Sequence, residues 1–236
     1  MRRIKNKVCK NFIIIILVLI LLSFNIENVN AKNIDLHQWM IKRAGEVNAW
    51  YCTLRPELTK ADILSYEELY DRTKWIIQYA EELNYLYPEI HPRRIAKDFF
   101  AVVEFETHFV NYKNMDDGKS FGITALTWQT TQAAIDFFGY ELDVYRKDSN
   151  GKIYYNEYHR NLLRGNPELQ IKFGIWYYYK LLSRYYNGDR LVALTGYNAG
   201  PGLDINGPRF RNYYFNIRGR LEYYEDEFKK LLQEIE

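Results

Sequence analysis

Apolar residues recur at helical spacing along much of the chain beyond residue 60. Between residues 65 and 86, Leu69, Ile76, Ala80 and Leu83 follow one another at intervals of seven, four and three, with charged residues elsewhere. This pattern predicts an amphipathic helix. A second helix is predicted to start at Pro92, because proline is favoured in the first turn of a helix.

Three further helices are predicted toward the C-terminus. Asn166 and Pro167 supply a cap and a first-turn proline for a helix with one apolar face. The residues of that face are Ile171, Ile175, Tyr178, Leu182 and Tyr185. Asp189 is expected to cap a short helix that stops at Gly200, and the charge-rich segment from about 210 to 234 is expected to form the last helix.

The segment around Asn150-Gly151 differs from the rest. Its flanks, residues 144–145 and 153–155, carry β-branched and aromatic side chains, and an Asn-Gly pair between such flanks predicts a small β-hairpin near residues 144–155. No internal repeat or low-complexity linker divides the chain. We therefore expect a mainly α fold with one domain over residues 65–236, preceded by a helical lead-in over residues 32–64.

Residues 1–31 have the layout of a secretory signal peptide. Basic residues are followed by an apolar run over residues 12–24 and by a polar stretch that ends at Ala31. This run of about 13 residues is shorter than the roughly 20 that a membrane-spanning helix needs. We expect cleavage after Ala31 and a location in the periplasm, outside the cell or at the cell envelope. The alternative is that the segment is retained as an uncleaved anchor.

Charge and cysteine content narrow the function classes. Five of the 32 basic residues and one of the 30 acidic residues lie within residues 1–31, so the remainder has a net charge of −2. Such a chain lacks the electrostatic support for nucleic-acid binding, and no nucleic-acid partner is expected. Cys52 is the only cysteine beyond the predicted signal, which excludes an internal disulfide there. The four histidines include no pair at metal-ligand spacing, and neither a metal nor another cofactor is expected.

One carboxylate interrupts an apolar helix face. In the helix after Pro92, four residues spaced by four, three and four share a face. They are Ile95, Phe99, Val102 and Glu106. A carboxyl group at the end of such a stripe is partly desolvated, which raises its pKa and keeps a general acid protonated near neutral pH. The alternative is that Glu106 accepts from a backbone amide at the helix end and does no chemistry. Glu104 lies about 200° around this helix, in line with Lys97, and is expected to face solvent.

Two later segments bear on the role of Glu106. Residues 120–126 read Ser-Phe-Gly-Ile-Thr-Ala-Leu, a loop that leads into a helix, and Gly122 there permits a close backbone approach. Residues 193–202 read Ala-Leu-Thr-Gly-Tyr-Asn-Ala-Gly-Pro-Gly. Taken in order with Glu106, these segments resemble the motif series of the lytic transglycosylases of the soluble murein transglycosylase type, which share their fold with goose-type lysozyme.

The first two motifs match by residue type and distance. Glu106-Thr107-His108-Phe109 is similar to the family's Glu-Ser followed by an aromatic residue, with Thr107 in the serine position. Gly122-Ile123-Thr124-Ala125 is similar to the family's Gly-Leu-Met-Gln segment. Thr130-Thr131 stands at the distance of the Thr-Ala pair that follows it in the family.

The later motifs make the resemblance specific. Residues 196–202 match the family's Ala-Tyr-Asn-Ala-Gly-Pro-Gly nearly letter for letter. Residues 211–214 are similar to a closing Arg-Asn-Tyr-Val segment. The resemblance covers about residues 65 to 225.

The resemblance implies a lysozyme-like fold and a peptidoglycan lytic transglycosylase. Such an enzyme cleaves the β-1,4 bond between N-acetylmuramic acid and N-acetylglucosamine and leaves a 1,6-anhydromuramoyl end. Glu106 would be the single general acid/base, because the substrate supplies its own 6-hydroxyl as nucleophile, whereas most glycosidases need two carboxylates. The implied partner is the peptidoglycan glycan strand, other cell-envelope proteins stay open as partners, and a monomer is expected.

The resemblance also implies roles around Glu106. Tyr197 would hydrogen-bond or orient it, Asn198 would hold the motif in register, and Tyr213 would close one wall. Ser120 and Gly122 would line the sugar groove. The expected substrate-binding set is Thr107, Ser120, Gly122, Tyr197, Asn198 and Tyr213.

Two positions depart from the family pattern, and two alternatives stay open. Ala125 stands where Gln is usual, and Thr124 replaces the Met of an apolar wall. A hydrolytic muramidase of the same fold would need a second carboxylate, for which Asp116 or Asp117 is the candidate; otherwise these two form a solvated turn. A non-catalytic peptidoglycan-binding protein would hold glycan without cutting it.

The aromatic run 176–179 is expected to belong to the core rather than to stack on sugars.

Overall fold

A computed structural model describes residues 36–55, 58, 62–200, 204 and 206–233. The chain divides into two compact units, Met1–Met40 and Ile41–Glu236. Of the first unit, residues 36–40 are described and are helical. The predicted signal peptide over residues 1–31 lies outside the described residues. Within the described ranges, no helix combines the length and the apolar character that a membrane crossing requires.

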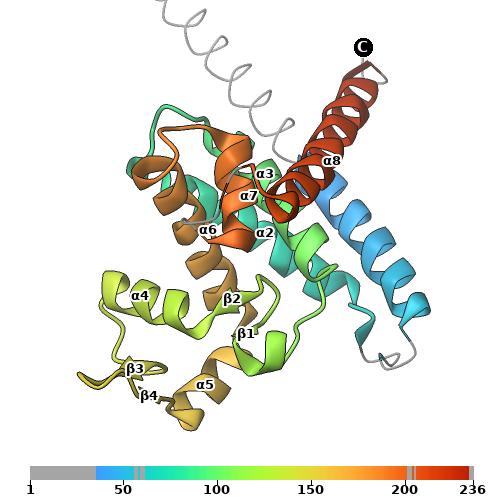
Figure 1. The fold of residues 1–236 in the computed structure, drawn as a ribbon. Helices are drawn as coiled ribbons and strands as arrows, with labels where there is room; N and C mark the ends of the chain where they lie inside the picture. Colours follow the sequence, from blue (N-terminus) through green and yellow to red (C-terminus); the bar gives the residue numbers. More distant parts are fainter. Residues whose placement is uncertain (1–35, 56–57, 59–61, 201–203, 205, 234–236) are drawn as a thin grey trace, which may run out of the picture. The chain divides into compact units, whose positions relative to one another are not determined.

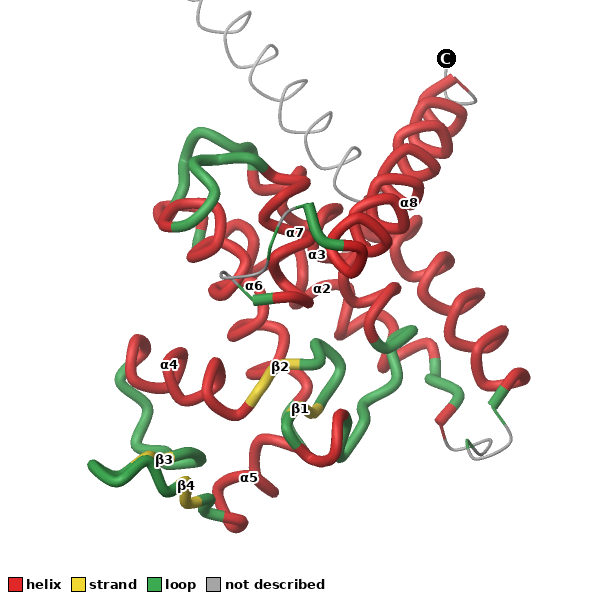
Figure 2. The backbone as a smooth tube through the Cα atoms, viewed as in Figure 1, coloured by secondary structure: helices red, strands yellow, loops and turns green. Residues whose placement is uncertain are grey.

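Helices account for most of the second unit, which confirms the predicted mainly α class (Figure 1, Figure 2). Residues 41–54, within the predicted lead-in, are helical. Helix α2 spans Tyr66–Glu82, and Ser65 caps it in a reciprocal capping box with Glu68. The predicted continuation to residue 86 is wrong, because the last residues turn into a separate 3-10 helix, η2, over Asn84–Leu86.

Proline opens two of the long helices, as predicted. Helix α3 spans Pro92–Glu106, and helix α6 spans Pro167–Arg184 with Asn166 as its N-cap. The predicted apolar face of α6 is fully buried at Ile171, Ile175, Tyr178 and Leu182. Tyr185 does not continue this face and is 48% exposed, because α6 ends before it and Tyr185 is the C-cap.

The two C-terminal helices also lie close to their predicted positions. Helix α7 spans Arg190–Ala199, with Asp189 accepting from the amide of Val192 at its start and Gly200 at its end. Helix α8 spans Pro208–Gln233, close to the predicted segment from 210 to 234. The Pro-Gly pair that follows Gly200 lies outside the described residues.

A β-hairpin occurs where it was predicted, near residues 144–155. Strand β3 (Arg146–Lys147) pairs antiparallel with strand β4 (Ile153–Tyr154). The first strand starts after Val144, because Val144 is buried and its amide donates to the side chain of Gln132 at 2.7 Å.

A second antiparallel pair lies inside the segment that was predicted only as a loop. Strand β1 (Ser120–Phe121) follows the short helix η3 (Asp116–Gly118) and pairs with strand β2 (Leu126–Thr127). Helix α4 (Trp128–Phe138) comes directly after β2 and is capped by the Thr127 side chain. Strands of two residues are too short for hydrophobic alternation to reveal them in a sequence. The remaining helix, α5, spans Glu157–Arg164.

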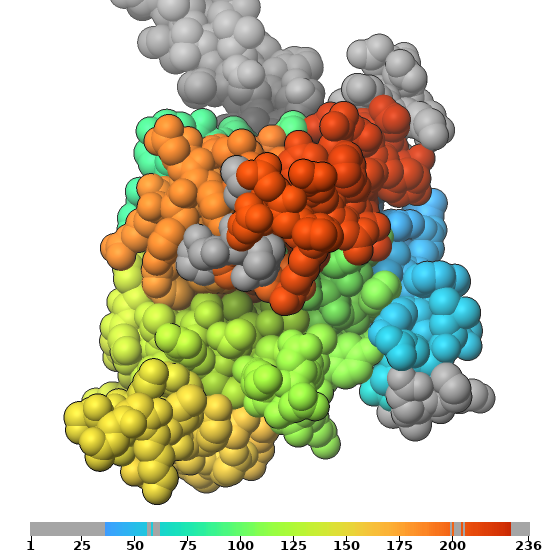
Figure 3. Space-filling model, viewed as in Figure 1, coloured from blue at the N-terminus to red at the C-terminus, as the bar shows by residue number. Residues whose placement is uncertain are grey.

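Two groups of elements can be followed in Figure 1. Helix α3 packs against α2, α7 and α8, and these four form one group. Helix α4, the two strand pairs and α5 form the other. Helix α6 contacts α2 and α7 of the first group and α4 and α5 of the second, so it joins them. Figure 3 shows a face on which α4, in yellow-green, lies next to α7 and the start of α8, in orange to red.

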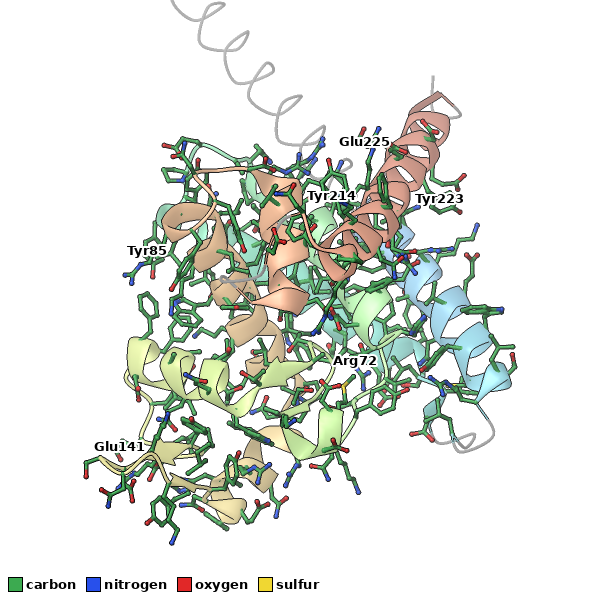
Figure 4. All side chains as sticks on the ribbon, in the orientation of Figure 1. Arg72, Tyr85, Glu141, Tyr214, Tyr223 and Glu225 are labelled. Atoms are coloured by element: carbon green, nitrogen blue, oxygen red, sulfur yellow. The ribbon has the colours of Figure 1, made fainter. Side chains whose placement is uncertain are left out.

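Glu104 is buried, which corrects the prediction that it faces solvent. Its carboxylate accepts two hydrogen bonds from Arg43 at 2.7 and 3.0 Å and one from the Tyr224 hydroxyl at 2.6 Å, and the Arg220 guanidinium lies 3.4 Å away. Tyr223, labelled in Figure 4, lies on α8, and the Arg43 guanidinium stacks over its ring. The distance from Arg43 Cζ to the ring centre is 5.0 Å. The helix that carries Arg43 and helix α8 both cover this side of α3, so the face that an isolated helix would present to water is enclosed.

Candidate active site

The C-terminal end of α3 places Glu106 in the wall of a cleft of about 520 Å³. The loop before α4, helix α4 itself and parts of α6, α7 and α8 supply the other walls. The polar side chains in these walls include Asp116, Ser120, Lys180, Tyr197, Asn198 and Arg209. Both groups of elements therefore contribute to the cleft around Glu106, the carboxyl group that interrupts the apolar face of α3.

Two side-chain donors hold the Glu106 carboxylate. The Tyr213 hydroxyl on α8 donates to Oε1 at 2.6 Å. Asn198 Nδ2 on α7 lies 2.9 Å from Oε1 and 3.2 Å from Oε2. Both partners are side chains of other helices. Among the described residues, these contacts argue against the alternative in which a backbone amide at the helix end holds Glu106.

Burial raises the pKa of Glu106 above its ordinary value, and the negative charge of Asp116 acts in the same direction. The hydrogen bonds from Tyr213 and Asn198 and the positive charge of Arg209 lower the pKa. Burial outweighs them, because it penalises the charged form of the carboxyl group most strongly. A carboxyl group with a raised pKa in the wall of a cleft has the properties of a general acid.

Arg209 contacts the other end of the Asn198 amide. Its Nη2 donates to Asn198 Oδ1 at 3.3 Å, and this leaves the donor nitrogen of the amide toward Glu106. Asn198 was predicted to hold its motif in register, and the structure shows in addition a direct contact with Glu106. Tyr213, predicted to close one wall, likewise contacts Glu106 directly.

Tyr197 does not make the contact that was predicted for it. Its hydroxyl donates to the carbonyl of Thr124 at 3.1 Å rather than to Glu106, although its side chain lines the same cleft. Its ring packs edge-on against Phe99, with centroids 5.9 Å apart. Gly174 on α6 makes room for this arrangement, because a Cβ there would lie 2.9 Å from the Tyr197 hydroxyl and 2.5 Å from Phe99 Cζ.

Thr107 and Gly122 support the site from behind and are not among the described residues that line the cleft. The Thr107 hydroxyl is buried and donates to the carbonyl of Ile123 at 2.7 Å, which ties the end of α3 to the loop. Gly122 has a φ of +82°, and a Cβ there would lie 2.3 Å from Oε1 of Gln170 on α6. The missing side chain of Gly122 therefore faces Gln170, and its sugar-lining role stays a prediction.

Gln170 is a supporting residue that the sequence analysis missed. Its Oε1 accepts from the amide of Ile123 at 2.8 Å, and its carbonyl accepts from the Thr124 hydroxyl at 3.2 Å. Thr124 is thus buried and bound to α6, and it is not a wall of the cleft. Ala125, the other departure from the family pattern, does line the cleft and has a positive φ of 50°.

Ser120 and Asp116 lie together in the cleft wall. The Ser120 hydroxyl donates to Asp116 Oδ2 at 2.7 Å. Asp116 and Asp117 are both exposed, as predicted for a solvated turn, and both have positive φ values, 49° and 57°. Asp117 lines a different cavity, so only Asp116 of the two shares the cleft with Glu106.

The aromatic run 176–179 is divided between core and cleft. Trp176, Tyr178 and Tyr179 are buried, as predicted, whereas Tyr177 is half-buried and lines the cleft. Burial raises the pKa of Tyr177 to about 12, so its hydroxyl stays a neutral donor and acceptor. Nothing in the local sequence separates Tyr177 from its neighbours, and the same is true of Lys180 and Arg209, which were also missed.

Among the described residues, no group of three or more His, Cys, Asp or Glu side chains is placed to hold a metal ion. Comparison of the sequence with models of known protein families and with curated proteins gives no match.

Proposed function

We propose that the protein is a peptidoglycan lytic transglycosylase with a lysozyme-like helical domain, exported to the periplasm or cell envelope by residues 1–31. The observation that carries the proposal is the state of Glu106. It is a carboxyl group with a raised pKa, held by two side-chain donors in the wall of a cleft. The order and spacing of the sequence motifs support glycan strands as the substrate.

The contacts of Glu106 distinguish its two oxygens. Oε1 accepts from Tyr213 and Asn198 at 2.6 and 2.9 Å, whereas Oε2 has only the longer contact of 3.2 Å with Asn198. In the neutral acid the proton therefore resides on Oε2, since Oε1 already accepts two hydrogen bonds. Oε2 is the atom that would donate to the substrate.

The proposed reaction passes two protons through the same carboxyl group. Glu106 gives its proton to the glycosidic oxygen as the bond from that oxygen to the anomeric carbon of N-acetylmuramic acid breaks. The resulting carboxylate takes the proton of the muramic 6-hydroxyl, whose oxygen bonds to the anomeric carbon and closes the anhydro ring. Tyr213 and Asn198 stabilise the carboxylate between these steps. No water is consumed, and the acid is regenerated.

A hydrolytic muramidase is the second candidate, because Asp116 places a second carboxylate in the same cleft. In that mechanism Asp116 would activate a water molecule that attacks the anomeric carbon. The two mechanisms differ in their products. Transglycosylation leaves an anhydro end, whereas hydrolysis leaves a reducing end.

Mass spectrometry of the products released from intact sacculi tests the proposal. The wild-type protein is compared with Glu106→Gln and with Glu141→Gln, which alters an exposed carboxylate outside the cleft (Figure 4). We expect anhydro muropeptides, about 18 Da lighter than their hydrated counterparts, from the wild type and from Glu141→Gln, because neither lacks the acid. Glu106→Gln is expected to release none.

The other outcomes are equally definite. Reducing ends that disappear in Asp116→Asn would establish the muramidase instead. Binding to sacculi without any released product would leave a non-catalytic binding protein. If the wild-type protein neither binds sacculi nor releases products from them, peptidoglycan is excluded as the ligand.

A further inference from the structure

A cavity of about 700 Å³ lies where the turn of η3, the residue after β4 and helix α5 meet. Asp117 and Lys119 line it from the turn, Tyr155 from the end of the hairpin, and Arg160 and Arg164 from α5. We call it the α5 cavity. None of the described residues that line it also lines the cleft, so it is a separate space that the proposed reaction does not use.

Two arginines of α5 hold one wall of the α5 cavity together. The Glu157 carboxylate accepts from Arg160 and, at 3.1 Å, from Arg164. Arg160 also donates to the carbonyl of Gly118 at 3.1 Å, and Arg164 donates to Asn114 Oδ1 at 2.9 Å. The two arginine side chains are only 8% and 14% exposed. These contacts tie the turn to α5, so the cavity has a fixed shape and a ligand loses little free energy in ordering it.

Tyr155 supplies an aromatic wall. The Arg160 guanidinium lies over the rings of both Trp128 and Tyr155, 4.1 and 4.4 Å from their centres. This stacking holds the ring of Tyr155, although Tyr155 is 44% exposed. Tyr154 and Tyr158, close to it in the chain, are 46% and 70% exposed. Exposed aromatic groups beside polar side chains are typical of a binding site, and a tyrosine ring offers a flat apolar face with a polar edge.

The lining of the α5 cavity offers hydrogen-bond donors and acceptors in nearly balanced charge. Asp117 and Lys119 are exposed, and no hydrogen bond or ion pair joins either side chain to another described residue. Of the described residues, three cations and two carboxylates line the cavity, namely Lys119, Arg160, Arg164, Asp117 and Glu157. A highly charged ligand gains little from such a lining. Hydroxyl groups, which both donate and accept, and acetamido groups match it.

We propose that the α5 cavity is a second saccharide-binding site, which holds an uncleaved stretch of a glycan strand while the cleft cuts. The apolar face of a sugar ring packs on Tyr155, and its polar groups bond to Asp117 and Lys119. The inference rests on the proposed function, which makes glycan strands the saccharide that the protein meets. Asp116 of the cleft and Asp117 of the α5 cavity are adjacent in the chain, so the two sites are close together. Glycan held at one site therefore has a raised effective concentration at the other.

Sacculi and a soluble glycan oligomer of a few sugars separate the roles of the two sites. The oligomer is cut when it fills the cleft alone, whereas a sacculus presents long strands that occupy both sites at once. We expect Tyr155→Ala to lower kcat/KM on sacculi about five- to tenfold, since loss of an aromatic contact is worth that factor, and to keep kcat/KM on the oligomer within about twofold of the wild type. A misfolded variant would instead lower both rates equally. Tyr85→Ala, which alters an exposed tyrosine outside both sites (Figure 4), is the matched control and is expected to keep both rates.

Lys119→Ala is a second variant, and its exposed side chain makes it harmless to the fold. We expect a loss of about threefold on sacculi and no loss on the oligomer, because one hydrogen-bonding group is removed. Lys74→Ala, which alters an exposed lysine on α2, is its control. If the ratio of the two rates is the same in the wild type, Tyr155→Ala and Lys119→Ala, the proposal is overturned.

Pelleting with sacculi measures binding without turnover when Glu106→Gln is the parent protein. We expect the Kd to rise about five- to tenfold when Tyr155→Ala is added and to stay constant when Tyr85→Ala is added. Failure of the proposed function has a different signature, because the wild-type protein would then release no anhydro product from either substrate. The pelleting measurement still decides in that case, since a Kd that Tyr155→Ala leaves unchanged would overturn the second site.

Discussion

Burial and hydrogen bonding act on the Glu106 carboxyl group in opposite directions. Burial favours the neutral acid, which can donate its proton, whereas Tyr213 and Asn198 favour the carboxylate that results. Activity that requires the neutral acid is present below the pKa of Glu106 and is lost as pH rises through it. Each donor lowers the pKa of Glu106 and therefore moves the basic limb of the pH profile to lower pH.

Tyr213→Phe removes one donor and leaves the ring in place. The pKa of Glu106 should rise, because the hydrogen bond that favours the carboxylate is gone. We expect the basic limb of the kcat/KM profile to move to higher pH and the maximal rate to fall about 10- to 100-fold, since the carboxylate formed in the reaction is less stabilised. Tyr214→Phe, which alters the next residue of α8, is the control. A basic limb that stays in place would mean that Tyr213 does not act on Glu106.

Glu106→Gln should stabilise the fold at neutral pH. A carboxyl group whose pKa is raised by folding binds more protons in the native state than in the unfolded state, so the free energy of unfolding falls as pH rises through that interval. Glutamine does not titrate and avoids this loss. We expect the Tm of the variant to exceed that of the wild type at pH 7 to 8 and to match it near pH 4. Each kcal/mol gained in the free energy of unfolding raises the Tm by roughly 2–4 °C. A constant difference at all pH values would contradict the raised pKa.

Helix α3 carries two glutamates, two residues apart, with different fates. Glu106 opens on the cleft, whereas Glu104 is enclosed by the helix that carries Arg43 and by α8. The Glu104 cluster thereby fixes both neighbouring helices to α3. Since α8 also supplies Tyr213, the same contacts help to hold the Glu106 donor in place.

Glu104→Gln should weaken this attachment strongly. The substitution removes the charge that balances Arg43 and Arg220, whose side chains are 24% and 26% exposed. We expect the free energy of unfolding to fall by about 2–3 kcal/mol, somewhat less than for a fully buried pair. Urea unfolding with an unchanged m-value is the measurement. Glu222→Gln, which breaks the exposed pair with Arg218, is expected to leave the stability unchanged. Equal effects of the two variants would contradict the role of Glu104.

Gly174→Ala tests the close packing of α6 against α3 and α7. The added methyl group would meet Phe99 and Tyr197, so we expect a loss of about 1–3 kcal/mol in unfolding free energy, despite the better helix propensity of alanine. Activity should also fall, because Tyr197 lines the cleft. Gly219→Ala on α8 is the matched control, since nothing lies within 4 Å of its Cβ position. This control should be neutral or stabilising; a loss as large as that of Gly174→Ala would show that packing is not the cause.

At the scale of the whole molecule, features that depend on neighbouring residues could be predicted from the sequence, whereas features that depend on distant residues could not. The starts of α3, α6 and α7 follow from a proline or a capping side chain within a few residues, and the structure places them accordingly. The burial of Glu104 depends on Arg43 and Arg220, which lie far from it along the chain. No pattern within one helix reports what another segment places against it.

The candidate site shows the same limit. The motifs indicated which residue types gather around Glu106, and the cleft does bring Ser120, Tyr197 and Asn198 beside it. They did not indicate which atoms touch. The hydrogen bond to Glu106 was therefore expected from Tyr197, whereas Tyr213 makes it, and the missing side chain of Gly122 faces Gln170.

The contacts of Glu106 also determine the order in which the site is assembled during synthesis of the chain. Ribosomes make the chain from its N-terminus, and Glu106 precedes Asn198 by 92 residues and Tyr213 by 107. Arg209, which donates to the oxygen of the Asn198 amide, is likewise made late. A growing chain thus carries its acid long before the groups that hold it, and the site is complete only after the first turns of α8 have folded back. On the proposed function, the chain cannot act on a glycan strand before that point in its folding.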